Sequence, residues 1–86
     1  MQAHTKIYMA HFGYGETDFM PCEACGRQAV DVHHITGRGK GKDVIENLMA
    51  LCRKHHEDCH NEKISKGAAQ YVHNSFLLGR RQVFYK

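Results

Sequence analysis

The 86-residue sequence has no long run of apolar residues. No stretch approaches the about 20 apolar residues that a membrane-spanning helix requires, so no membrane association is predicted. The N-terminal stretch MQAHTKIYMAHF has neither an apolar core nor a small-residue cleavage pattern, so no signal peptide is predicted. Repeats, low-complexity tracts and linkers are also missing. We therefore expect one small domain over residues 1–86, located in the cytoplasm.

A strong net charge is also missing. The formal net charge is only +3, which does not by itself identify a nucleic-acid-binding protein. The placement of the cations is more informative, because GRGKGK (37–42) sets Arg38, Lys40 and Lys42 among three glycines. Glycine lets backbone N–H groups approach phosphates, and the cations attract them, so these three residues are candidate DNA contacts. In isolation the hexamer fits a solvated, flexible loop equally well, and GRR (79–81) is a second basic point.

Four cysteines bear on stability and on the cellular compartment. A chain of this length buries a small core, and such domains commonly recruit disulfides, a metal ion or a partner subunit. The four cysteines could form two disulfides, but Cys22 and Cys25 form a C-x-x-C sequence, whose geometry suits zinc better. Gly26 follows and permits the tight turn of a zinc knuckle. We expect bound zinc and a reducing, cytosolic compartment.

The N-terminal segment is predicted to be a short helix over residues 3–12. Its apolar face would carry Ala3, Ile7 and Ala10, and Gly13 would end it. The residues from there to the C-x-x-C sequence are predicted to form a loop.

The rest of the chain is predicted to contain two extended segments followed by two helices. Alternation of apolar and polar residues predicts a strand over 27–35, and a second extended segment falls within 43–51. Helices are predicted over 53–64 and over 66–78, the last capped by Ser65. The predicted order is helix, knuckle, strand, loop, strand, helix, helix.

The stretch LCRKHHEDCH (51–60) holds two cysteines and three histidines, more metal ligands than one ion needs. His56 and His60 are four residues apart, so their imidazoles project from one helix face and can chelate one metal ion. His55 points roughly 100° away around the helix axis and pairs instead with Cys52 as C-x-x-H. The stretch therefore predicts two metal sites on neighbouring stripes of one helix.

The first of these sites is predicted to hold structural zinc. The pair Cys52 and His55 completes a C-x2-C-x26-C-x2-H pattern with Cys22 and Cys25, which is typical of tetrahedral zinc. Cys59, a softer ligand, is the alternative fourth ligand. We predict His55, because its spacing after Cys52 matches that of the knuckle, whereas Cys59 lies ~6 Å further along the helix. Cys59 is then expected to be a small buried residue.

Two further signals are weak alone: the pair of histidines at 33–34 and the asparagine at 47. Their spacing adds weight, since His34 to Asn47 is thirteen positions, Asn47 to His56 nine, and His56 to His60 four. Through CEACG, VDVHHI, ENLMALC and RKHHEDCH, over about residues 22–62, the chain resembles the HNH endonuclease family with its ββα-metal (His-Me finger) core. It resembles especially the small phage and bacterial members with a zinc-stapled finger. The spacings of nine and four also match those of colicin DNases, which lack the zinc.

The resemblance implies an α+β fold: a ββα-metal finger, made of a two-stranded hairpin plus helix, with a zinc knuckle and flanking helices. It implies a metal-dependent DNA endonuclease of bacterial or phage origin that hydrolyses phosphodiester bonds. His34 would be the general base, and Asn47 would bridge the loop between the strands and hold His34 in place. The implied ligands of a catalytic divalent metal are His33, His56 and His60. The implied ligands of the structural zinc are Cys22, Cys25 and Cys52, with His55 where many relatives have a fourth cysteine.

The chemistry of these residue types fits that activity. Histidine ordinarily has a pKa near ~6.5, which suits general-base catalysis at neutral pH. Three imidazoles favour Mn²⁺, Ni²⁺, Co²⁺ or Zn²⁺ over Mg²⁺, whereas the resemblance implies tolerance that includes Mg²⁺. Asp31 would orient a ligand histidine or be an exposed strand carboxylate, and Arg38 would contact the phosphate.

Two other functions compete with this one. A non-catalytic, zinc-stapled DNA-binding module would explain the knuckle and the basic loop, but it gives no reason for the histidine and asparagine set. A zinc domain that binds another protein would leave the basic loop unexplained as well. Because so small a domain offers little surface for reading bases, we expect either low sequence specificity or reliance on a homodimer or a partner protein.

Overall fold

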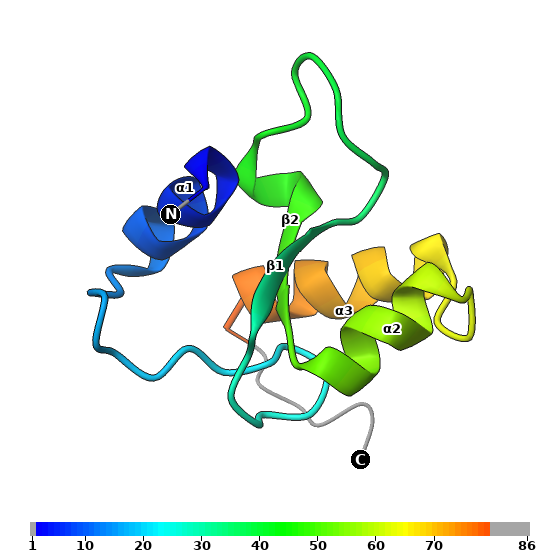
Figure 1. The fold of residues 1–86 in the computed structure, drawn as a ribbon. Coiled ribbons are helices and arrows are strands. Elements are labelled where there is room, and N and C mark those ends of the chain that lie inside the picture. Colours follow the sequence, from blue (N-terminus) through cyan, green and yellow to red (C-terminus); the bar gives the residue numbers. More distant parts are fainter. Residues whose placement is uncertain (1, 80–86) are drawn as a thin grey trace.

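The computed structural model of the protein describes residues 2–79. Its elements, in chain order, are α1 (Ala3–Phe12), β1 (Asp31–His34), the 3₁₀ helix η1 (Ile45–Asn47), β2 (Leu48–Leu51), α2 (Arg53–His60) and α3 (Lys66–Leu77). The two strands form an antiparallel hairpin between the helices (Figure 1), so the predicted α+β class and element order are confirmed. Within the described residues no helix has the length and apolar character to span a membrane. Of the short basic segment GRR (79–81), only Gly79 lies within the described residues.

The hairpin has an apolar core on each of its two faces. His33 pairs with Met49 and His34 with Leu48, and neighbouring residues of a strand face opposite sides. On the α1 side the core cluster consists of Tyr8, Ala29, Val32, Leu48 and Ala50. On the side of α2 and α3 it consists of Cys22, Ala24, Ile35, Met49, Leu51, Cys52, Ile64, Ala69 and Val72. The same alternation sends His33 toward α2 and His34 toward α1.

The predicted apolar face of α1 is wrong. Ala3 and Ala10 are exposed and Ile7 is 39% exposed, whereas His4 and Tyr8 are buried. The large ring of Tyr8 fills the core, and both polar side chains are satisfied, since Tyr8 Oη donates to a glutamate and His4 Nε2 donates to a backbone carbonyl. Hydrogen bonding removes the cost of burying them, so apolar character alone points to the wrong face.

The predicted strand over 27–35 is longer than the observed β1. The residues just before it close the knuckle instead, because Cys22 N donates to Arg27 O at 2.6 Å and Gly26 N donates to Cys22 O at 2.8 Å. Gly26 has φ 81°, the left-handed conformation that the tight turn requires. The second extended segment corresponds to η1 followed by β2.

The predicted helix over 53–64 ends early, at His60. Glu62 has φ 60°, and Ile64 turns back into the core, where its N–H donates to Asp58 O at 3.1 Å. Burial of this apolar side chain therefore outweighs continuation of the helix. In contrast, α3 matches its predicted range to within one residue, and Ser65 Oγ accepts from Ala68 N at 3.1 Å as the predicted cap.

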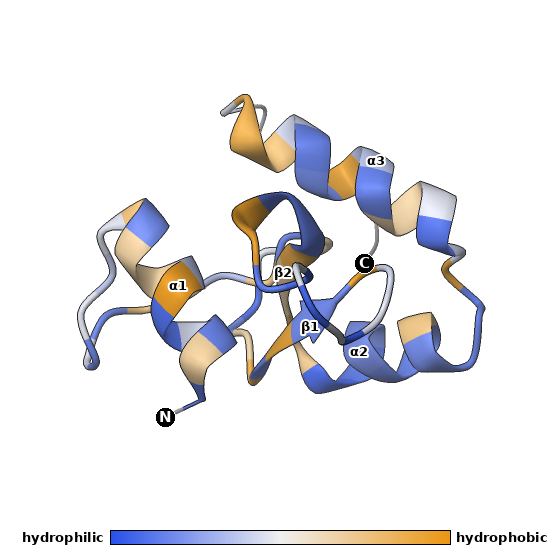
Figure 2. Ribbon diagram, turned by 90° about the horizontal axis from the view of Figure 1, so that it is seen from above, coloured by the Kyte–Doolittle hydropathy of each residue, from blue (hydrophilic) through white to orange (hydrophobic). Residues whose placement is uncertain are grey.

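Helix α2 is hydrophilic over most of its length (Figure 2). Of its eight residues only His55 is buried. A helix this short is marginal by itself and normally depends on a packed apolar stripe, which α2 lacks. Its attachment to the hairpin must therefore come largely from the cysteine and histidine contacts at its start.

A buried polar network connects the elements that surround the hairpin. Glu23, in the knuckle, accepts a hydrogen bond from Tyr8 Oη and lies 2.7 Å from His73 Nδ1 of α3. His73 Nε2 in turn donates to Ile45 O at 2.6 Å, which fixes the start of η1. Although burial favours the neutral ring, the hydrogen bond and charge of Glu23 raise the pKa of His73. The network thus ties α1, the knuckle and α3 to the element that carries Asn47.

Candidate active site and metal centres

Cys22, Cys25, Cys52 and His55 form one compact cluster, in which one ligand atom from each lies within 4.8 Å of the others. Cys22 and Cys25 lie in the knuckle turn. Cys52 is the N-cap of α2, and His55 lies in the first turn of that helix. The distance from Cys25 Sγ to Cys52 Sγ is 3.9 Å, and His55 Nδ1 lies 3.2 Å from Cys52 Sγ and 3.7 Å from Cys22 Sγ.

These distances fit a tetrahedral zinc ion. Bonds of ~2.3 Å to sulfur and ~2.0 Å to nitrogen place two sulfurs roughly 3.8 Å apart and a sulfur and a nitrogen roughly 3.6 Å apart. Burial raises the pKa of the Cys22 thiol to about 12, so a thiolate there needs a cation beside it. The donor set and its spacing therefore suit zinc.

Cys59 lies outside this cluster. It is half-buried and packs against the core on the α3 side, and burial raises the pKa of its thiol to about 11. The sequence predicted a small buried residue here, and the observed burial of Cys59 is only partial. Among the described residues the fourth position of the cluster is held by His55.

His33, His56 and His60 form the second cluster, also with ligand atoms within 4.8 Å of one another. His33 extends from β1, while His56 and His60 lie one turn apart on α2. The Nε2 atoms of His56 and His60 are 3.1 Å apart. Two nitrogens that share a metal at ~2.0–2.1 Å are separated by roughly 2.9–3.4 Å, so the pair already has the spacing of a shared ligand site.

The environment of this cluster favours the neutral form of the His33 and His56 imidazoles, which is the form that binds metals. Burial and the neighbouring imidazoles of His56 and His60 lower the pKa of His33 to about 4. Burial likewise lowers the pKa of His56, against the opposing effect of Asp31. Asp31 Oδ2 lies 3.6 Å from His56 Nδ1, on the side of the ring away from Nε2. The carboxylate is therefore placed to orient His56.

His34 lies on the opposite face of β1 and is 8% exposed. Its Nε2 is 2.7 Å from Asp43 Oδ1, and its ring packs against that of His4 with the ring centres 4.4 Å apart. The carboxylate of Asp43 accepts the Nε2 proton, so Nδ1 of a neutral ring keeps its lone pair. Asp43 is therefore placed to orient the ring of His34.

The side chain of Asn47 closes the loop between the strands. Its Oδ1 accepts from Thr36 N and Thr36 Oγ1, both at 2.8 Å, and its Nδ2 donates to Lys42 O at 3.0 Å and Gly37 O at 3.3 Å. Within residues 2–79 the amide makes no hydrogen bond to His34 itself. Any support that it gives to His34 passes through the loop residues on either side, Thr36 and Gly37 after the histidine and Lys42 before Asp43.

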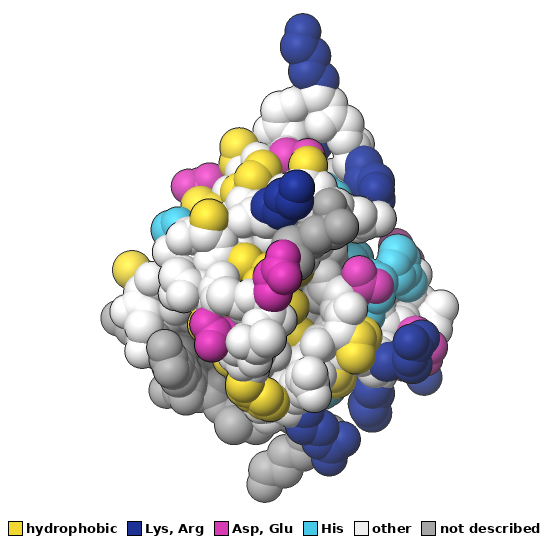
Figure 3. Space-filling view, turned by 60° about the vertical axis from the view of Figure 1, so that its left-hand side comes forward, with side chains coloured by type: hydrophobic (Ala, Val, Ile, Leu, Met, Phe, Trp, Pro, Cys, Tyr) yellow, Lys and Arg dark blue, Asp and Glu magenta, His cyan; other side chains and the backbone are white. Residues whose placement is uncertain are grey.

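The three cations of the glycine-rich loop differ in their exposure and contacts. Gly37, Gly39 and Gly41 all have positive φ (98°, 147° and 78°), so the loop depends on glycine for its path. Arg38 and Lys40 are exposed, whereas the ammonium of Lys42 donates to Thr36 Oγ1 at 3.3 Å. In Figure 3 histidine side chains gather at one edge of the molecule, with basic side chains above and below them.

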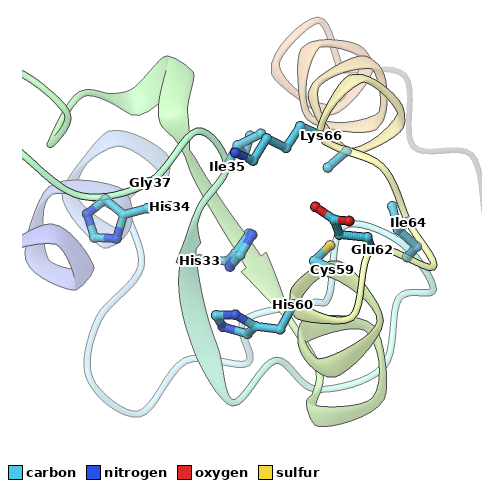
Figure 4. A pocket seen from close by; sticks show the side chains of 10 residues that line it. His33, His34, Ile35, Gly37, Cys59, His60, Glu62, Ile64 and Lys66 are labelled. Atoms are coloured by element: carbon cyan, nitrogen blue, oxygen red, sulfur yellow. The ribbon is translucent and has the colours of Figure 1, made fainter.

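Two cavities meet at the histidines. The larger, of about 500 Å³, is lined by Gln2, Asp31, Val32, His33, His34, Gly37, Arg38, His56 and His60. The smaller, of about 210 Å³, shares His33, His34, Gly37 and His60 with it and continues toward α3 (Figure 4). The three-histidine cluster and His34 therefore border the larger cavity together, although the two strand histidines leave β1 on opposite faces.

Sequence reasoning did not find two neighbours of His34. His4 comes from α1 and Asp43 from the end of the glycine-rich loop, and neither has a spacing to the other site residues that suggests contact. His4 and Tyr8 are four residues apart and so share one face of α1, and this spacing was an available signal for a buried face. Nothing local to Asp43 indicates its position.

Comparison with known proteins agrees with this geometry. Residues 22–66, more than half of the chain, match the family model described as HNH endonuclease. The chain is 37% identical over 51 residues to the uncharacterized protein YdfU of Escherichia coli (strain K12), an alignment that covers 52% of this chain and 14% of that protein. This chain therefore spans a small part of that relative. No solved structure matches the chain.

Proposed function

Because the chain belongs to the HNH endonuclease family, we propose that it is a metal-dependent DNA endonuclease that hydrolyses phosphodiester bonds. The observation that carries the proposal is the position of His34 beside the cluster of His33, His56 and His60, in a hollow that Arg38 also lines. A module that only binds DNA has no use for three imidazoles converging beside a fourth. The proposed substrate is DNA, contacted through Arg38 and Lys40, with Lys42 stabilising the base of the loop.

Two metal ions are proposed, with different tasks. Zinc would be held by Cys22, Cys25, Cys52 and His55, where it would fasten α2 to the knuckle. A divalent ion would be held by His33, His56 and His60. That ion would supply Lewis-acid stabilisation of the charge that develops on the phosphate and on the leaving 3′ oxygen.

The remaining chemistry falls to the side chains. His34 is the proposed general base: Asp43 accepts the proton on Nε2, which leaves Nδ1 to take a proton from the attacking water. Asp31 orients His56, and Asn47 fixes the loop that follows His34. Arg38 attracts the DNA backbone to the hollow.

Replacement of His60 by alanine tests the assignment of the three-histidine cluster. Loss of one ligand should weaken binding of the catalytic metal while leaving the zinc cluster intact. We expect the metal concentration for half-maximal plasmid nicking to rise at least tenfold, with activity partly restored at high metal concentration. A His60→Ala variant with the wild-type metal dependence would exclude His60 as a ligand. His11→Ala, on the exposed face of α1, is the matched control.

The fourth zinc ligand is tested by a pair of alanine variants on α2. His55→Ala should lose zinc or melt at a markedly lower temperature, because the buried cluster keeps three thiols and no fourth donor. Cys59→Ala should retain zinc and change stability little, since that side chain is only half-buried. Elemental analysis and thermal unfolding measure both effects. An X-ray absorption spectrum with four sulfurs around the zinc, instead of three sulfurs and one nitrogen, would assign the position to Cys59.

A further inference from the structure

Several residues that line the smaller cavity have no role in the proposed reaction. Beyond the histidines and Gly37, it is lined by Ile35, Cys59, Glu62, Ile64, Lys66 and Ala69 (Figure 4). Ile35, Ile64 and Ala69 are buried and form an apolar floor. The turn between α2 and α3 supplies Glu62 and Ile64, and the first turn of α3 supplies Lys66. The smaller cavity therefore extends from the three-histidine cluster toward α3, and Arg38 does not line it.

Cations stand on both sides of the cluster. Arg38 lines the larger cavity and Lys66 the smaller one, and His33 and His60 line both. The side chain of Lys66 is exposed and extends from the start of α3 toward β1, beside the opening of the smaller cavity (Figure 4). A DNA strand whose scissile phosphate lay at the histidines would carry further phosphates on both sides, within reach of the cavities that Arg38 and Lys66 line.

We infer that the smaller cavity is a binding site for the nucleotide next to the scissile phosphate, with Lys66 contacting its phosphate. This inference rests on the proposed endonuclease function. The apolar floor packs against the sugar, and the ammonium of Lys66 neutralises the charge of the phosphate. The strand then crosses the active site from the glycine-rich loop to the start of α3.

Glu62 is the one acidic residue among those that line the smaller cavity, and it gives the inference a second, opposite test. Its carboxylate lies on the α2 side, away from the β1 end of the opening (Figure 4). A phosphate in the cavity is attracted by Lys66 and repelled by Glu62. Removing the two charges should therefore change DNA affinity in opposite directions.

The experiment is a fluorescence-anisotropy titration of a labelled duplex with the zinc-loaded full chain, without added divalent metal, over a range of salt concentrations. For Lys66→Ala we expect the dissociation constant to rise about three- to tenfold at ~0.1 M salt, and the slope of log affinity against log salt to become shallower by about 1. Glu62→Gln should tighten binding about twofold or more at the same salt concentration. Lys63→Ala, an exposed cation in the same turn that does not line the cavity, should leave the slope close to that of wild type.

The comparison with Lys63 decides the outcome. Equal effects of Lys66→Ala and Lys63→Ala would overturn the inference, because any surface cation would then do the same. No effect of Lys66→Ala would also overturn it, because Lys66 would then not contact the DNA. If Glu62→Gln weakens binding, the inference is overturned as well. Since the titration needs no cleavage, these failures are distinct from failure of the proposed function, which would appear as an enzyme that binds DNA through Lys66 and never cuts it.

Discussion

His34→Ala is expected to cut DNA about 10²–10⁴-fold more slowly than the wild-type protein, because it removes the proposed general base. Zinc content and DNA affinity should stay close to those of wild type, since His34 belongs to neither metal cluster. The measurement is single-turnover cleavage at saturating divalent metal, which separates loss of the chemical step from loss of metal.

Two comparisons make the His34 result specific. His11→Ala removes an exposed histidine from α1 and should cleave at the wild-type rate. Asp43→Asn keeps a hydrogen-bond acceptor beside His34 Nε2 but removes its charge, so it should cleave at an intermediate rate. A His34→Ala variant as active as wild type would show that another group activates the water.

Removal of zinc should unfold the domain. Structural zinc contributes about 10–16 kcal/mol to the folding of small zinc-binding peptides, as much as the whole stability of a typical domain. Here α2 has only His55 buried, and both Cys22 and Cys52 belong to the core cluster on the α3 side. The zinc would therefore hold together the knuckle, the hairpin and α2, the helix that carries two proposed ligands of the catalytic metal.

The measurement for zinc is elemental analysis combined with thermal unfolding. Purified protein should carry about one tightly held zinc per chain, and Cys22→Ser should lose both the zinc and the cooperative transition. Cys59→Ser changes the same kind of side chain outside the cluster and should melt like wild type. Zinc-free protein that still melts cooperatively would refute the structural role.

The sequence was informative about the directions of the cysteines and histidines in α2 and β1. The helical period places His56 and His60 on one face of α2 and turns His55 toward the cysteines, and the structure contains both groups. The strand period likewise separates His33 from His34. The resemblance to the HNH family is confirmed by the match over residues 22–66. The ligand and catalytic roles of these residues stay predictions.

Contacts that depend on tertiary packing were not predictable in the same way. Asp43 and Lys66 reach the site only because the loop and the turn between α2 and α3 fold back over the hairpin. On α1, hydrogen bonds allow His4 and Tyr8 to be buried in place of Ile7. The end of α2 is set by burial of Ile64, which no local propensity indicates.

The central claim is that this domain hydrolyses DNA with the help of a divalent metal. Its most direct test is incubation of supercoiled plasmid with the zinc-loaded protein, with and without added Mg²⁺, Mn²⁺, Ni²⁺ or Co²⁺. The expected result is conversion to open-circular or linear DNA only when a divalent metal is added, with 5′-phosphate and 3′-hydroxyl ends. Plasmid that stays supercoiled with every metal, while the folded, zinc-loaded protein binds it, would contradict the claim and identify a non-catalytic, zinc-stapled DNA-binding module.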